Sequence, residues 1–130
     1  MKRLRALGLA ALLVALGTCG GPDLPTTGWL QVLLSSPNTD DGGVLFIVSG
    51  GPIDSVRSSY ADFFAARQGG SWRMLVAGGL APGVVAEVWV PDLGAVATYT
   101  GTVEQVAQRT TYAQRPTSAY RVSIERLSAP

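Results

Sequence analysis

VVAEVWV, residues 84–90, is the stretch that decides the fold. Pro82 and Gly83 precede it and Pro91 follows it, so breakers bound it on both sides. Apolar side chains at every second position are typical of a β-strand with one face in a core. We expect one side, Val84, Ala86, Val88 and Val90, to face that core, and the other side to carry Val85, Glu87 and Trp89.

The same alternation continues outward in both directions. Residues 120–125 (YRVSIE) place apolar side chains on one side and polar ones on the other, and residues 30–35 (LQVLLS) predict a first strand. The continuous apolar run VLFIV at 44–48 predicts a buried central strand. We also expect a short edge strand at 53–57, and an extended segment at 97–108 with a bulge or bend at Gly101.

Residues 58–68 fit two structures. Ser59 and Asp62 have the spacing of a helix cap, and the aromatic residues that follow match a helical period. A strand over 61–67 that turns at Gly69-Gly70 into a second strand at 71–77 fits as well. We favour the hairpin because the segment is short for a stable helix.

These segments together predict seven or eight short strands in about 100 residues, separated by turns. This pattern is typical of an all-β, antiparallel, immunoglobulin-like β-sandwich. A small β-barrel is the alternative, because alternation alone does not separate the two architectures. We assign the domain to residues 29–130.

The N-terminus has the layout of an export signal. Lys2, Arg3 and Arg5 precede an apolar run at 6–16, and small residues follow it. A membrane-spanning helix needs roughly 20 apolar residues, so the run is too short to span. We predict a signal peptide at 1–18 and a flexible, Gly- and Pro-rich tether at 19–28.

Leu16-Gly17-Thr18-Cys19 resembles the lipobox of bacterial lipoproteins. The resemblance implies cleavage between Thr18 and Cys19 and attachment of lipid to the Cys19 sulfur, which would anchor the protein to a membrane. Gly20 stands where Gram-negative lipoproteins retained at the inner membrane carry Asp, so the resemblance implies a cell-envelope location that is the outer membrane if the cell is Gram-negative. The order of strands and turns, including residues 73–92, also resembles uncharacterised lipoproteins with a cohesin-like sandwich. Cohesins bind partner proteins on one sheet face.

Composition argues against several function classes. Without Lys2, Arg3 and Arg5, seven cations (all Arg) face nine acidic residues, a net charge of −2, which disfavours nucleic-acid binding. The chain has no His, the commonest general base, and its only Lys lies in the signal. The remaining candidates, Asp residues, lie at turns and strand ends, where their side chains bond nearby backbone N–H groups. We therefore expect no enzyme and no cofactor.

One acidic turn carries oxygen ligands of the kind that bind calcium. Asn38, Asp40 and Asp41 place oxygen-bearing side chains before Gly42, but the Glu that completes an EF-hand-like loop does not follow. A hairpin turn with Gly at positive φ explains the same residues, and we predict no metal site.

The remaining expectation concerns a binding surface. Trp89 and Glu87 lie opposite the predicted core side of their strand, and Arg121 and Tyr112 are of the types enriched at protein interfaces. The chain would then be a lipid-anchored, exported protein-interaction or structural module. A carbohydrate-binding module with exposed aromatics such as Trp89, or a carrier of small apolar ligands, is the alternative.

Overall fold

The computed structural model describes residues 24–127. Thr18, Cys19, the rest of the predicted signal and the first part of the tether lie outside the described residues. The strands are β1 (Gly28–Ser35), β2 (Asp41–Ser49), β3 (Ser55–Arg57), β4 (Asp62–Gln68), β5 (Ser71–Leu80), β6 (Gly83–Val90), β7 (Thr100–Gln108), β8 (Gln114–Arg115) and β9 (Arg121–Arg126), and one 3-10 helix, η3, spans Leu93–Thr98.

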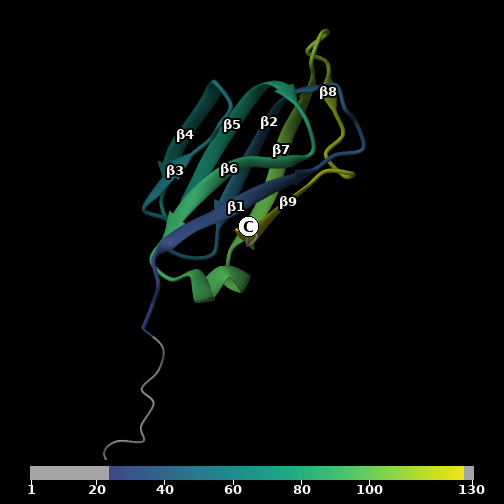
Figure 1. The fold of residues 1–130 in the computed structure, drawn as a ribbon. Coiled ribbons are helices and arrows are strands. Elements are labelled where there is room, and N and C mark those ends of the chain that lie inside the picture. Colours follow the sequence, from purple (N-terminus) through teal and green to yellow (C-terminus); the bar gives the residue numbers. More distant parts are fainter. Residues whose placement is uncertain (1–23, 128–130) are drawn as a thin grey trace, which may run out of the picture.

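The strands form two antiparallel sheets that pack face to face (Figure 1). One sheet has four strands in the order β3-β6-β1-β9, and the other has five in the order β4-β5-β2-β7-β8. The sheets do not close into a barrel, so the predicted β-sandwich is confirmed and the small barrel is wrong. The described residues hold nine strands rather than seven or eight, because the two-residue β8 is too short to leave a sequence pattern.

The core lies between the sheets and is built from the predicted alternations. Leu30, Val32 and Leu34 point inward from β1, and the apolar run of β2 supplies Val44, Phe46 and Val48. Most of these side chains are fully buried, which removes their apolar surface from water and stabilises the fold by roughly 1.5–3 kcal/mol each. From the last predicted strand, Tyr120 and Val122 are buried as expected, although β9 begins only at Arg121.

A β-bulge corrects the predicted sides of β6. Val32 pairs with Ala86 and the next residue of β1, Leu33, pairs with Val84, so Val85 is the extra residue. A bulge shifts the alternation of the strand by one position. Val85 is therefore buried and Val84 exposed, the reverse of the expectation, whereas Ala86, Val88 and Val90 face the core as predicted.

The acidic turn was predicted wrongly as a hairpin. β1 and β2 belong to different sheets, and the residues between them cross from one sheet to the other. Gly42 and Gly43 lie inside β2, and neither has a positive φ. The sheet to which a strand belongs depends on tertiary pairing, which the turn residues do not specify.

The hairpin alternative for residues 58–68 is confirmed. β4 and β5 pair from Asp62 opposite Ala77 to Gln68 opposite Ser71, and Gly69 takes a φ of +59° in the turn. Glycine adopts this left-handed conformation without steric cost. The predicted edge strand at 53–57 is also present, as β3 at one edge of the four-stranded sheet.

The segment predicted as extended from residue 97 begins instead with the end of η3. Asp92 caps this helix by accepting a hydrogen bond from the Gly94 amide at 2.9 Å. The bulge in β7 is at Glu104 and not at Gly101. Gly101 serves a different purpose, because an added Cβ would lie 2.4 Å from Val122 Cγ1 on β9.

The predicted tether ends earlier than residue 28. Gly28 belongs to β1, and the Leu93 amide donates a 2.8 Å hydrogen bond to the Thr26 carbonyl. An added Cβ at Gly28 would lie 2.8 Å from Leu93 Cδ1, so glycine allows η3 to pack closely here. Figure 1 shows η3 at the end of the sandwich where the chain enters from the N-terminus.

Candidate functional site

Trp89 and Glu87 lie on the outer face of the four-stranded sheet, as their alternation predicted. Trp89 pairs with Trp29 across β6 and β1, and the two rings meet edge to face with centroids 5.3 Å apart and planes at 72°. Both rings are half-buried. This geometry is the favoured one for aromatic pairs, but it does not present a flat platform.

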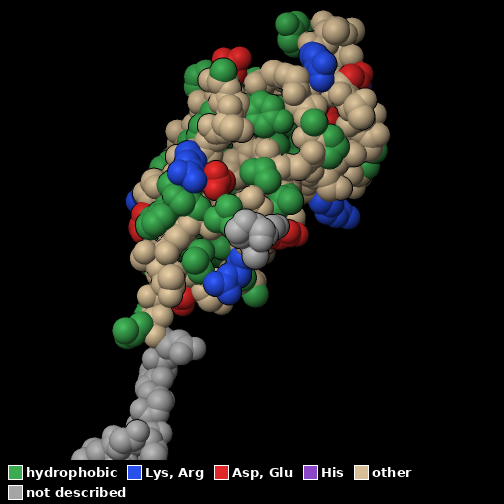
Figure 2. Space-filling model, viewed as in Figure 1, with side chains coloured by type: hydrophobic (Ala, Val, Ile, Leu, Met, Phe, Trp, Pro, Cys, Tyr) green, Lys and Arg blue, Asp and Glu red, His purple; other side chains and the backbone are tan. Residues whose placement is uncertain are grey.

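Arg57 completes this group. Its guanidinium carbon lies 3.8 Å from the centroid of the Trp29 ring, and its Nε and Nη2 donate to the two Glu87 carboxylate oxygens at 3.2 and 3.3 Å. We call Trp29, Arg57, Glu87 and Trp89 the tryptophan–arginine cluster. Its charged groups already have partners within the cluster, so little is left for a ligand to satisfy. Figure 2 shows hydrophobic and charged side chains interspersed on this side of the molecule.

The other two predicted surface residues do not join the cluster. Arg121 pairs with Ser35 on the same sheet, but it lies four positions before Glu125, which is in the row of Glu87. Four strand residues span about 13 Å. Tyr112 is 78% exposed, has a φ of 58°, and lies in the turn between β7 and β8 of the other sheet.

Trp29 and Arg57 were missed as members of this surface. Trp29 precedes the alternating part of its strand, and the three-residue β3 that carries Arg57 shows no clear pattern. The signal that identifies them is cross-strand register, and sequence alternation does not contain it.

A second surface lies on the outer face of the five-stranded sheet. Phe64, Leu75 and Leu45 are consecutive cross-strand partners on β4, β5 and β2. Two shallow grooves, of about 200 and 160 Å³, follow this row and share Leu45 and Leu75 as lining residues. We call these three residues the apolar strip.

The apolar strip ends at an exposed edge. Phe64 is 64% exposed and lies on β4, which forms one edge of the five-stranded sheet. At the side of the strip, Arg73 donates to Glu104 from Nε at 2.9 Å and from Nη2 at 2.5 Å. An apolar patch with a charged margin is the usual composition of a protein-interaction surface.

Asp40 and Asp41 of the acidic turn form a cluster of ion pairs with Arg115. Arg115 donates to both carboxylates, with Nη1 2.7 Å from Asp40 Oδ1 and 2.8 Å from Asp41 Oδ1. Tyr120, Ser36 and Gln108 add further hydrogen bonds to the two acids. The contact with Arg115 holds the pKa of Asp40 well below its usual range and raises that of Arg115. This acid–arginine cluster joins the start of β2 to β8.

Arg73 and Arg115 are engaged with acids on separate strands, and Tyr120 is buried. Over residues 24–127, no three Asp, Glu, His or Cys side chains converge as metal ligands. Within the same range, no helix is long and apolar enough to cross a bilayer.

Comparison with known proteins adds no relative. No known protein family matches the chain, and neither the curated proteins nor the solved structures yield a match.

Proposed function

We propose that the protein is a lipid-anchored, exported, non-enzymatic β-sandwich that presents the apolar strip to a partner protein of the cell envelope. The lipid anchor would be on Cys19, after cleavage behind Thr18, and in a Gram-negative cell the location would be the outer membrane. The observation that carries the proposal is the apolar strip, whose Phe64 is 64% exposed at a sheet edge.

The position of the apolar strip supports a protein partner. Water-exposed apolar surface is unfavourable unless a partner covers it, at about 25 cal/mol per Å². β4 is an edge strand, so one row of its backbone N–H and C=O groups faces away from β5 and is open to pairing with an added strand. A partner segment could then gain backbone hydrogen bonds and side-chain burial together.

The four-stranded sheet supplies a matched control. Val84 is 40% exposed on the outer face of that sheet, so Phe64 and Val84 are exposed apolar residues on opposite faces. We would place a photoreactive phenylalanine analogue at each position in the full chain and crosslink it in native cells. We expect the analogue at position 64 to give one discrete crosslinked partner. In a separate experiment, we expect Phe64→Asp to abolish co-purification of that partner.

The comparison of crosslinking at positions 64 and 84 shows which face of the sandwich binds the partner. If position 84 crosslinks to a partner and position 64 does not, the tryptophan–arginine cluster side is the contact surface. If Val84→Asp and Phe64→Asp leave co-purification equally intact, neither face carries the interaction.

The anchor is tested separately. We expect Cys19→Ser to abolish incorporation of labelled palmitate and to leave the precursor uncleaved. Equal labelling of the variant and the parent chain would contradict the assignment of Cys19.

A further inference from the structure

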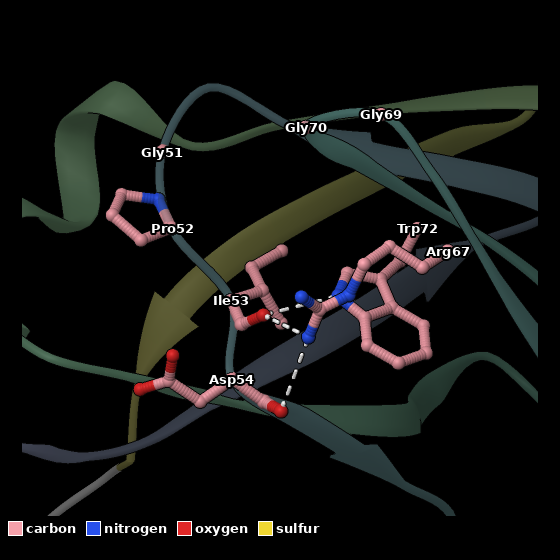
Figure 3. Close-up of a pocket in the computed structure, with 8 residues that line it drawn as sticks. All are labelled: Gly51, Pro52, Ile53, Asp54, Arg67, Gly69, Gly70 and Trp72. Atoms are coloured by element: carbon pink, nitrogen blue, oxygen red, sulfur yellow. Dashed lines mark hydrogen bonds between the residues drawn. The ribbon is translucent and has the colours of Figure 1, made fainter.

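A cleft of about 330 Å³ opens between the β2–β3 connection and the turn of the β4–β5 hairpin. Pro52 and Asp54 lie on one side of it and Arg67 and Trp72 on the other, with Ile53 between them (Figure 3). The volume is at the lower end of the range for small-molecule sites. None of these residues belongs to the apolar strip.

Hydrogen bonds hold in place the wall of the cleft that carries Arg67 and Trp72. The Ile53 carbonyl accepts from Trp72 Nε1 at 3.1 Å and from Arg67 Nη2 at 3.2 Å, and Nη2 also donates to the Asp54 carbonyl at 3.4 Å (Figure 3). The guanidinium carbon of Arg67 lies 4.9 Å from the centroid of the Trp72 ring. The positions of the ring and the cation are therefore set without a ligand.

The opposite wall is also fixed. The buried Tyr99 donates a 2.6 Å hydrogen bond from its hydroxyl to the Pro52 carbonyl. An added Cβ at Gly51 would lie 2.9 Å from Tyr99 Cζ, so glycine lets the connection lie directly against the ring. A cleft with two fixed walls needs little ordering when a ligand binds.

The charges of the cleft limit the class of ligand. Within residues 24–127, neither Arg67 nor Asp54 makes a salt bridge. Both bidentate edges of a guanidinium include Nη2, and Nη2 of Arg67 already donates to two carbonyls, so a two-point grip on a carboxylate or phosphate is blocked. Asp54 would also repel such an anion. A purely apolar ligand would displace water from the Asp54 carboxylate and provide no hydrogen bonds in place of those to water.

A neutral ring that carries hydroxyl groups offers a suitable partner to each charged and apolar group of the cleft. Its hydroxyls can donate to the Asp54 carboxylate and accept from Nε or Nη1 of Arg67. Its apolar C–H surface can pack against Trp72 and Pro52. We propose that this cleft binds a neutral saccharide unit, a function beyond the protein contact assigned to the apolar strip.

Calorimetric titration of the full-length protein in a sugar-free detergent tests the proposal. The probes are cellobiose, maltose and N,N′-diacetylchitobiose as neutral sugars, and galacturonate and inorganic phosphate as anions. We expect saturable binding of at least one neutral disaccharide, weakened about tenfold or more by Asp54→Asn and by Arg67→Gln, because each variant leaves a hydroxyl without its charged partner.

Arg57→Gln is the matched control. Arg57 also stacks on a tryptophan, Trp29, but it does not line the cleft, so this variant should bind the sugar unchanged. Thermal midpoints show which variants stay folded, and the exposed Asp54 provides the variant least coupled to folding. Binding of none of the neutral disaccharides, binding of only the anions, or an equal loss in Arg57→Gln would each overturn the proposal.

Discussion

Tyr120 donates a 2.8 Å hydrogen bond from its hydroxyl to Oδ1 of Asp41, which lies 79 residues earlier in the chain. Asp41 is only 1% exposed and also accepts from Arg115 and Ser36. A buried carboxylate is tolerated only where such donors replace its water. This contact therefore helps to stabilise the connection between the two sheets.

The first prediction concerns this hydroxyl. Tyr120→Phe keeps the buried ring but removes a hydrogen bond to a charged group, so we expect a loss of about 1.5–3 kcal/mol in the free energy of unfolding. Urea denaturation followed by fluorescence measures it. Tyr112→Phe is the control, because Tyr112 is 78% exposed and its change should stay within about 0.5 kcal/mol. Equal stability of both variants would contradict the role given to the Asp41 contact.

The second prediction concerns acid pH. Arg115 lowers the pKa of Asp40 in the folded protein below its usual value of 3.8. Stability from this pair is therefore fully present above about pH 3.8 and is lost as the pH falls through the lower, folded value. We expect Asp40→Asn to unfold at lower urea than the parent at neutral pH, and the two midpoints to converge as the pH falls below 3.8.

Salt provides a check on the same pair. The Asp40 side chain is 49% exposed, so added salt should screen its attraction to Arg115. The neutral-pH difference between the parent and Asp40→Asn should shrink in about 1 M salt. A difference that is unchanged by both pH and salt would show that charge is not its origin.

The third prediction concerns a backbone position. Gly50 has a φ of +110°, and an added Cβ would lie 2.0 Å from the Thr98 carbonyl oxygen. We expect Gly50→Ala to destabilise the fold by at least about 1–3 kcal/mol, the usual range for a strained backbone. Gly70→Ala is the control, because its Cβ would meet nothing within 4 Å and its φ is not positive. That variant should be neutral or slightly stabilising, since alanine restricts the unfolded chain.

The fourth prediction concerns the edge-to-face pair of Trp29 and Trp89. A double-mutant cycle of Trp29→Leu and Trp89→Leu, measured by chemical denaturation, should give a coupling free energy of about 0.5–1.5 kcal/mol. Additive single effects would mean that the two rings do not interact.

Much of the fold was predictable because alternation reports which side of a strand faces the core. The inward positions of β1 were predicted for this reason, whereas the β4–β5 hairpin was predicted because residues 58–68 are short for a stable helix and Gly69-Gly70 supplies a turn. The bulge at Val85 was not, because one extra residue leaves the local pattern apolar on both sides. The sequence also did not show that the β1–β2 connection crosses from one sheet to the other, because residues 40–43 suit a hairpin turn equally well.

The candidate sites were less predictable. Trp89 and Glu87 were assigned to one face correctly, but their partners Trp29 and Arg57 come from other strands. The saccharide cleft needs Asp54 and Arg67, which meet only because the β2–β3 connection crosses the end of the β4–β5 hairpin.

The sequence by itself determined the all-β class, most strand positions, most of the core-facing residues, and the N-terminal pattern that predicts export and lipid attachment. These features depend on local spacing, and local spacing is written in the chain. Only the tertiary structure decided which strands pair, that Arg115 forms salt bridges with both Asp40 and Asp41, and where the apolar strip and the cleft lie. The physical reason is that antiparallel strands with similar alternation can pair in many orders, and the choice depends on the packing of the whole core.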